Sequence, residues 1–197
     1  MIVKISDVAE AQSGLVLGRK EAKDSASVHY QYKRLTLRAL GEDGYIDTDE
    51  LEKFSASELL DDALFTTTES VVVRLFSPMY PVLIDESSKG LLVPSQLAVL
   101  RVKDCKVILP QYLRLCLSQK TLQERVAKIE SGTAQRTVKI GTIMDLEIVV
   151  PELKTQYRVV EIDALSRRRE RMYRNLIEQE RLLTDNIIEN IIGGALK

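Results

Sequence analysis

The chain has 197 residues, of which 45% are hydrophobic and 29% are charged, a composition typical of a folded protein rather than a disordered one. It contains one histidine, two cysteines and no glycine-rich phosphate loop of either standard spacing, which argues against most zinc enzymes and nucleotide-binding enzymes. It has no apolar run of the roughly 18 residues that a membrane span needs, and its first residues, MIVKISDVAEAQSG, do not resemble a signal peptide. We therefore expect a cytoplasmic protein with reduced cysteines, without a membrane segment and without a cofactor.

The net charge of −1 is unevenly distributed along the chain. Residues 41–62 contain nine acidic residues and one lysine, so the other 175 residues carry a net charge of +7. A basic remainder of this kind can present a basic face to an acidic partner, although ordinary surface variation explains it equally well.

The N-terminal part of the chain predicts short strands joined by polar loops. Residues 2–11 are interpreted as a strand followed by a helical turn with Ser6 as its N-cap. Residues 28–40 alternate, which predicts one strand. Its outward face would carry Tyr30, Tyr32, Arg34, Thr36 and Arg38, and its inward face Gln31, Lys33, Leu35, Leu37 and Ala39.

The central part predicts one helical turn and a series of strands. Ser55 and Glu58 have the spacing of a capping box, so a short helical turn is expected there. Strands are expected at 71–76, 82–84, 91–93 and 97–102.

Helices dominate the rest of the chain. Pro110 suits a first helical position and opens an apolar helix. A second capping box at 121–124 predicts another helix that ends near Gly132. A helical turn at 142–145 and a strand at 146–150 follow.

The C-terminal segment predicts one long helix. Nothing interrupts a helix from Leu153 or Thr155 to Ile192, and Gly193-Gly194 are interpreted as its stop. Its apolar residues recur at steps of three, four and seven, as in a coiled coil. We expect the following residues to form a dimer interface: Ile162, Leu165, Met172, Leu176, Leu183, Ile187 and Ile191. The alternative is that this helix folds back over its own domain.

The sequence offers little for catalysis. His29 is the only histidine and lies in a polar loop, so we interpret it as a solvated side chain, and Cys105 and Cys116 as packing residues. Asp61-Asp62 could bind a metal, but a solvated surface is the better interpretation. Basic and polar loop residues are stronger candidates, because such side chains contact phosphates and base edges. The predicted DNA-binding set is Arg19, Lys20, Lys23, Tyr32, Lys89, Gln96, Thr133, Gln135, Arg136 and Lys139; Arg34 and Arg38 share the predicted strand face with Tyr32.

The order of short motifs resembles one half of the specificity subunit of type I restriction–modification systems. The residues that carry the resemblance span essentially the whole chain: Lys4–Ala9 with Ser13-Gly14, Leu91–Val99, Leu109–Leu113, Ser131–Thr133, Leu146–Pro151 and Gln156. The resemblance implies a target recognition domain followed by a spacer helix. It also implies partnership with methyltransferase and restriction subunits that carry out the chemistry, so that this chain is not itself an enzyme. The full-length subunit of that family has two such domains and two antiparallel helices.

We therefore predict an α+β fold, in which residues 1–152 form a mixed α/β target recognition domain and residues 153–197 a long C-terminal coiled-coil helix. The predicted function is sequence-specific recognition of double-stranded DNA by a homodimer that reads two half-sites. The alternative is a non-catalytic interaction module, a coiled-coil adaptor that does not bind DNA. The target sequence, the modified base, and whether the partner half-subunit is identical or different stay open.

Overall fold

The structure is a computed structural model that describes residues 1–24, 27–130 and 137–195. These divide into two units, which we call unit 1 (Met1–Val160) and unit 2 (Glu161–Lys197). Among the described residues, every strand and the α-helices before the last one lie in unit 1, and unit 2 is the greater part of one long helix.

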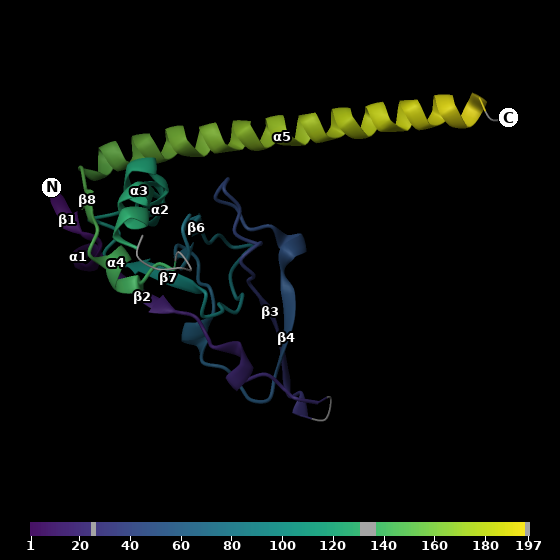
Figure 1. Ribbon diagram of the computed structural model, residues 1–197. Helices are drawn as coiled ribbons and strands as arrows, with labels where there is room; N and C mark the ends of the chain where they lie inside the picture. Colours follow the sequence, from purple (N-terminus) through teal and green to yellow (C-terminus); the bar gives the residue numbers. More distant parts are fainter. Residues whose placement is uncertain (25–26, 131–136, 196–197) are drawn as a thin grey trace. The chain divides into compact units, whose positions relative to one another are not determined.

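An antiparallel four-stranded sheet of order β2-β7-β5-β6 organises unit 1 (Figure 1). Its strands are β2 (Ala9–Ser13), β5 (Val71–Arg74), β6 (Val82–Leu83) and β7 (Leu97–Val102). Both faces of β5 are buried, because Val71 and Val73 belong to one apolar cluster and Val72 to another. Successive residues of a strand face opposite sides, so a strand covered on both faces needs the uninterrupted apolar run seen here.

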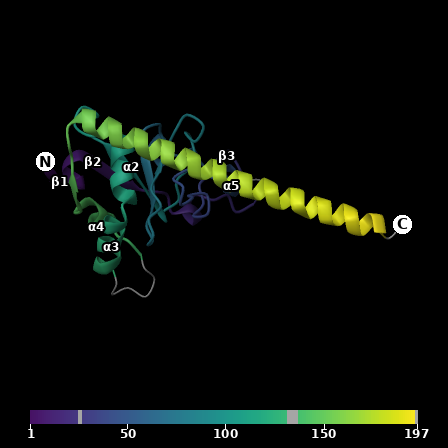
Figure 2. The ribbon, with the colours of Figure 1, turned by 90° about the horizontal axis from the view of Figure 1, so that it is seen from above.

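Four helices cover one face of this sheet: α1 (Ile5–Val8), α2 (Pro110–Ser118), α3 (Lys120–Ile129) and α4 (Ile140–Met144). Leu113, Leu117, Val126 and Ile143 are buried in the same cluster as Val71. Helices α2, α3 and α4 lie side by side (Figures 1 and 2). A two-stranded sheet of β1 (Ile2–Lys4) and β8 (Glu147–Val149) joins the N-terminus to the segment before the last helix.

The remaining two strands form a separate antiparallel pair, the β3–β4 ribbon. It pairs β3 (Tyr30–Arg34) with β4 (Glu52–Ala56). Its inner face packs on a third apolar cluster that contains Phe54 and Leu92. The 3-10 helices η1 (Leu17–Arg19), η3 (Thr48–Glu50) and η4 (Asp62–Leu64) lie in the segments around the ribbon.

Helix α5 (Leu153–Ala195) has 43 residues, a length of roughly 65 Å at 1.5 Å per residue. Its first two turns belong to unit 1 and the rest forms unit 2. Within unit 2, Arg167 Nε donates a hydrogen bond to Asp163 Oδ2 at 2.9 Å, an i,i+4 pair. None of the helices in the described residues has both the length and the apolar character that crossing a membrane requires.

The prediction of one strand over 28–40 was wrong in its extent and its inward face. Strand β3 ends at Arg34, and within it Tyr32 and Arg34 are half-buried while Gln31 and Lys33 are exposed. The Tyr32 ring packs against the apolar cluster that contains Phe54 and Leu92. The large apolar surface of this ring therefore decides which face of β3 is inward, and Gln31 and Lys33 face outward.

Two further predictions about strands and turns were wrong. Ser55 lies within β4 instead of opening a helical turn, because pairing with Gln31 across the ribbon replaces the local capping arrangement. Residues 91–93 are buried but do not form a strand; Leu92 makes only isolated bridges, to Arg34 and to Phe65. The expected strand at 97–102 is confirmed as β7, and those at 71–76, 82–84 and 146–150 are present but shorter.

The helix boundaries also needed correction. Lys4, not Ser6, is the N-cap of α1, and its backbone N–H donates to Asp7 Oδ2 at 2.9 Å. Helix α3 begins at Lys120, so Thr121 is inside it rather than its cap. Helix α5 continues through Gly193 and Gly194, since glycine is only modestly unfavourable in a helix that is already formed. The predicted stop at Gly132 lies outside the described residues.

Candidate nucleic-acid interface

The base of the β3–β4 ribbon, where Arg34 pairs with Glu52, carries a pocket of about 190 Å³. Its lining residues are Arg34, Thr36, Leu37, Arg38, Glu52, Pro94 and Gln96. Gln96 was predicted as a DNA contact, and it is exposed here beside two arginines. The fold thus brings together residues that are about 60 positions apart in the sequence.

Carboxylates accompany both arginines of this pocket. Arg34 Nη2 forms an ion pair with Glu52 Oε2, and Arg38 Nε lies 3.7 Å from Glu50 Oε2. The Arg38 side chain is nevertheless 81% exposed, and an exposed ion pair of this kind contributes little to stability. Arg38 can therefore exchange its carboxylate partner for a phosphate.

Lys139 adjoins the same region through two backbone hydrogen bonds. The Leu75 N–H donates to the Gln96 carbonyl oxygen at 2.9 Å, and the Val138 N–H donates to the Leu75 carbonyl oxygen at 2.9 Å. The segments at Gln96 and Val138 are therefore both bonded to the same residue, Leu75. Lys139 is exposed. Thr133, Gln135 and Arg136, predicted in the same loop, lie outside the described residues.

Glu130 fixes the position of Lys139. Its Oε1 accepts a hydrogen bond from Thr142 Oγ1 at 2.5 Å and one from the Lys139 backbone N–H at 3.4 Å. The Thr142 hydroxyl is the main reason that the pKa of the Glu130 carboxyl is held below its ordinary value. The end of α3 is thereby joined to the beginning of α4.

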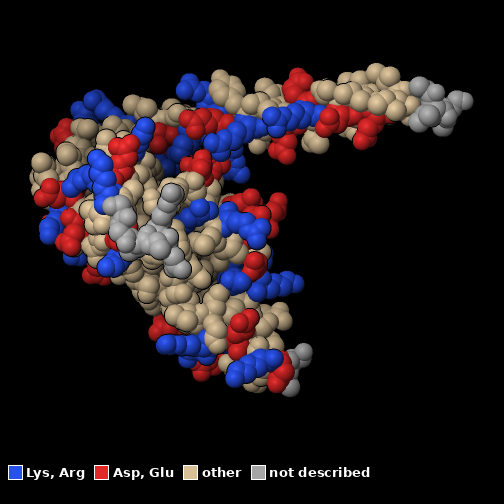
Figure 3. All heavy atoms as spheres, in the orientation of Figure 1, with Lys and Arg blue, Asp and Glu red and all other residues tan. Residues whose placement is uncertain are grey.

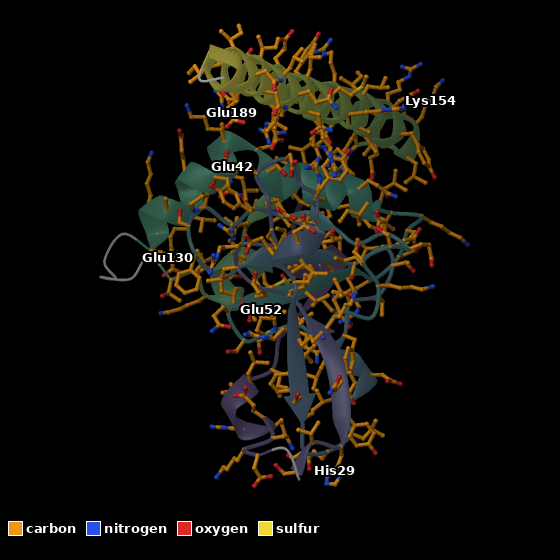
Figure 4. The ribbon with its side chains drawn as sticks, turned by 90° about the vertical axis from the view of Figure 1, so that its right-hand side faces the viewer. His29, Glu42, Glu52, Glu130, Lys154 and Glu189 are labelled. Carbon is orange, nitrogen blue, oxygen red and sulfur yellow. The ribbon has the colours of Figure 1, made fainter. Side chains whose placement is uncertain are left out.

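Arg19, Lys20 and Lys23 gather at the opposite end of the ribbon. This segment lies along the edge of β4, where the Ala22 N–H donates to the Ser55 carbonyl oxygen at 2.9 Å. Arg19 and Lys23 are exposed, whereas the Lys20 ammonium is paired with Glu58. Figure 4 shows His29 at the same tip and Glu52 near the other end of the ribbon. The ribbon therefore has one basic group near its base (Arg34, Arg38 and Lys139) and one at its tip (Arg19, Lys20 and Lys23). The five residues of β3 separate its two ends by roughly 14 Å.

Two of the predicted residues are placed differently. Tyr32 is half-buried, its ring lies 5.0 Å from that of Phe65, and its hydroxyl accepts a hydrogen bond from the Leu60 N–H at 3.4 Å. Lys89 is paired with Glu86 in the turn after β6, a turn that bonds to Thr66. Tyr32 therefore packs the ribbon onto its core, and Lys89 lies in neither basic group.

Sequence reasoning gave too little weight to two lysines of the ribbon. Lys33 was assigned to an inward face and Lys53 lies within the acidic block 41–62, but both are exposed on the outer face. Figure 3 shows Lys and Arg side chains, mixed with Asp and Glu, projecting from the edge of unit 1 where Figure 1 draws β3 and β4. Lys53 becomes a candidate only through its pairing with Lys33, which the register of the ribbon shows and the sequence pattern does not.

The other residues that could take part in catalysis or metal binding have structural roles or lie apart from one another. Asp61 Oδ1 accepts the Ala63 N–H at 2.8 Å as the cap of η4. Among residues 1–24, 27–130 and 137–195, no three His, Cys, Asp or Glu side chains are grouped to hold a metal ion. Cys105 is exposed, so its interpretation as a packing residue was wrong, whereas burial raises the pKa of the Cys116 thiol to about 11.

The solved structures that share this fold include three from type I restriction-modification systems. The type I restriction-modification system S subunit from M. genitalium matches with a TM-score of 0.61 and 16% identity, over 96% of this chain and 45% of that chain. The HsdS subunit from Thermoanaerobacter tengcongensis matches with a TM-score of 0.65 and 15% identity, over 96% and 47%. A chain from a structure of the type I R-M system matches with a TM-score of 0.63 and 15% identity, over 94% and 43%.

The chain spans slightly less than half the length of each of these proteins. No protein-family model matches its sequence, and no curated protein matches it. The likeness therefore concerns the fold: the predicted α+β architecture with a long C-terminal helix is confirmed, and it is that of half a type I S subunit.

Proposed function

We propose that the chain is the specificity component of a type I restriction–modification methyltransferase, and that two copies of it read two DNA half-sites. The observation that carries the proposal is the fold, one recognition unit followed by one long helix, which is half of the S subunits it matches. A second copy of this fold would supply the other half of that architecture.

The apolar stripe of α5 supports pairing through this helix. The seven predicted interface residues, from Ile162 to Ile191, are between 50% and 68% exposed in the chain. Complete burial of one such side chain contributes about 1.5–3 kcal/mol. An amphipathic helix of this length depends on packing of its apolar face for most of its order, so a partner surface is expected.

The charge distribution along α5 favours an antiparallel pair. Residues 153–174 have a net charge of +4 and residues 175–197 a net charge of −2. In an antiparallel pair the basic half of one helix faces the acidic half of the other. Each exposed pair contributes little, so charge would select the orientation rather than provide the affinity. A symmetric pair of this kind would present two identical recognition units in opposite orientation.

The two basic groups of unit 1 support contact with DNA. Arginine and lysine neutralise phosphates, and a glutamine amide can bond to an adenine edge in the major groove. Arg38, Gln96 and Lys139 at the base of the ribbon are proposed contacts, as are Arg19 and Lys23 at its tip. Thr133, Gln135 and Arg136 remain in the proposed set. The reaction itself, including extrusion of the target base, would belong to the methyltransferase subunit.

DNA binding and its salt dependence test this function. The full chain should bind duplex DNA with an affinity that falls steeply with salt concentration, because bound phosphates release counterions. Replacing Arg136 and Lys139 together with Ala should weaken binding, whereas replacing Lys106, an exposed lysine in the loop before α2, should not. If the chain dimerises but shows no salt-dependent DNA binding, it is an adaptor instead.

A further inference from the structure

The outer face of the β3–β4 ribbon places two lysines directly opposite each other. In the ribbon register Lys33 pairs with Lys53, and Gln31 pairs with Ser55 on the same face. Both lysines and Gln31 are exposed. The face is thus polar and basic along its length, although β4 lies within the most acidic segment of the chain.

Two like charges in this position oppose folding of the ribbon. Directly opposite residues of an antiparallel pair have Cβ atoms about 4.5–5.5 Å apart, and like charges there are destabilising. Glu50, Glu52 and Glu58 form their ion pairs with other bases. The ion pairs of this region join Lys20 to Glu58, Arg34 to Glu52 and Arg38 to Glu50.

No ion pair involves Lys33 or Lys53 in the described part of the chain, within the 4.0 Å that defines one. The residues outside the described part of the chain include no Asp or Glu. Three carboxylates of the acidic block, Glu50, Glu52 and Glu58, are paired with other bases, and the outer pair of lysines is left for an anion from outside the chain.

We propose that the outer face of the β3–β4 ribbon binds the phosphate backbone of duplex DNA, with Lys33 and Lys53 each neutralising one phosphate. The inference rests on the DNA-recognition function proposed above and adds the outer face of the ribbon to the proposed DNA contacts. A two-stranded ribbon is narrow enough to lie along or in the major groove, which is about 12 Å wide. The two lysine side chains are long enough to reach neighbouring phosphates, while Gln31 and Ser55 offer hydrogen bonds on the same face.

The salt dependence of DNA binding by the full chain tests this inference. The probe is a random-sequence duplex, because phosphate contacts do not depend on sequence. The variant is Lys33→Gln with Lys53→Gln, and the matched control is Lys106→Gln, which removes one exposed lysine elsewhere in unit 1. For the double variant the slope of log K against log salt should become less steep by about 1.8 per protomer, at 0.9 per phosphate contact. The control should keep the wild-type slope, because Lys106 is not a proposed DNA contact.

A thermal melt of the free chain separates loss of contacts from loss of fold. Because Lys53→Gln removes the repulsion across the ribbon, the double variant should melt at the same temperature as the wild type or higher, yet bind DNA more weakly. If the wild type binds and the double variant keeps its slope, or if Lys106→Gln loses as much, the ribbon assignment is wrong while DNA recognition stands. If the wild type does not bind DNA at all, the proposed function fails and this inference fails with it.

Discussion

The side-chain amide of Gln156 accepts a hydrogen bond from the backbone N–H of Leu109 at 2.9 Å. Its Nε2 donates to the carbonyl oxygens of Val107 at 2.9 Å and Pro151 at 2.8 Å, and the residue is fully buried. Leu109 is the N-cap residue of α2. One side chain therefore holds the first turns of α5 against the beginning of α2, all within unit 1.

Replacing Gln156 with Ala should strongly destabilise unit 1. The change leaves the buried Leu109 N–H and two partly buried carbonyl oxygens without their partner, and a buried unsatisfied group costs about 1–3 kcal/mol. A loss of about 2–4 kcal/mol in the free energy of unfolding is expected by chemical denaturation. Gln179→Ala is the control, because Gln179 is exposed on the same helix and should change stability by less than about 0.5 kcal/mol. Equal effects of the two substitutions would contradict this role.

Much of unit 1 could be predicted from the sequence, because its elements are locally encoded. Pro110 fixed the start of α2, and the apolar run at 97–102 identified β7. The β3–β4 ribbon could not be predicted in this way. Its strands are held by pairing between residues about 20 positions apart, and that pairing overrode the capping-box spacing of Ser55 and Glu58. Gln156 was marked only by the family resemblance, since periodicity carries no information about a buried amide.

The two cysteines should differ in reactivity. Burial raises the pKa of the Cys116 thiol to about 11, so at mildly alkaline pH only a very small fraction is thiolate, the form that reacts. Cys105 is exposed. Brief treatment of the native chain with iodoacetamide should therefore modify Cys105 alone, as read by mass spectrometry of peptides, and Cys116 should react only after unfolding. Equal modification of both in the native chain would contradict the packing of α2.

The hydrogen bonds of Glu130 should appear in the pH dependence of stability. The pKa of its carboxyl is lowered in the folded chain, chiefly by the Thr142 hydroxyl, so its contribution is present above its ordinary pKa of about 4.3 and is lost as the pH falls through the folded value. Glu130→Gln should melt at a lower temperature than the wild type at neutral pH, and the difference should shrink in acid. Glu124→Gln, an exposed carboxylate on α3, should show neither effect. A difference for Glu130→Gln that grows in acid would contradict the assignment.

Adjacent leucines of α5 test the dimer interface. Leu183 belongs to the predicted stripe and Leu182 does not, although the two are 56% and 58% exposed, because adjacent helical residues point about 100° apart. Leu183→Arg should shift the mass measured by light scattering from dimer to monomer, because dimerisation would remove the arginine charge from water and bury it in the apolar interface. Leu182→Arg should leave the dimer intact. Dissociation by Leu182→Arg and not by Leu183→Arg would show that another face of the helix makes the contact.

The candidate interface was less predictable than the fold, for a geometric reason. Gln96 and Lys139 were chosen for their place in loops, but only backbone bonding through Leu75 brings them to one edge. Tyr32 was chosen for its chemistry, and its packing against Phe65 instead makes it part of the core. A sequence pattern identifies residue types that suit DNA, whereas the strand register decides which of them share a surface.

The most direct measurement is the methylation pattern that the full chain directs when combined with a type I methyltransferase subunit. Sequencing of the methylated DNA should reveal one bipartite motif whose two half-sites are identical and inverted, because two copies of the same recognition unit are related by a twofold axis. The same reaction with Leu183→Arg should lose the motif. Methylation that is independent of this chain, or a motif without inverted half-sites, would contradict the account of a paired DNA reader.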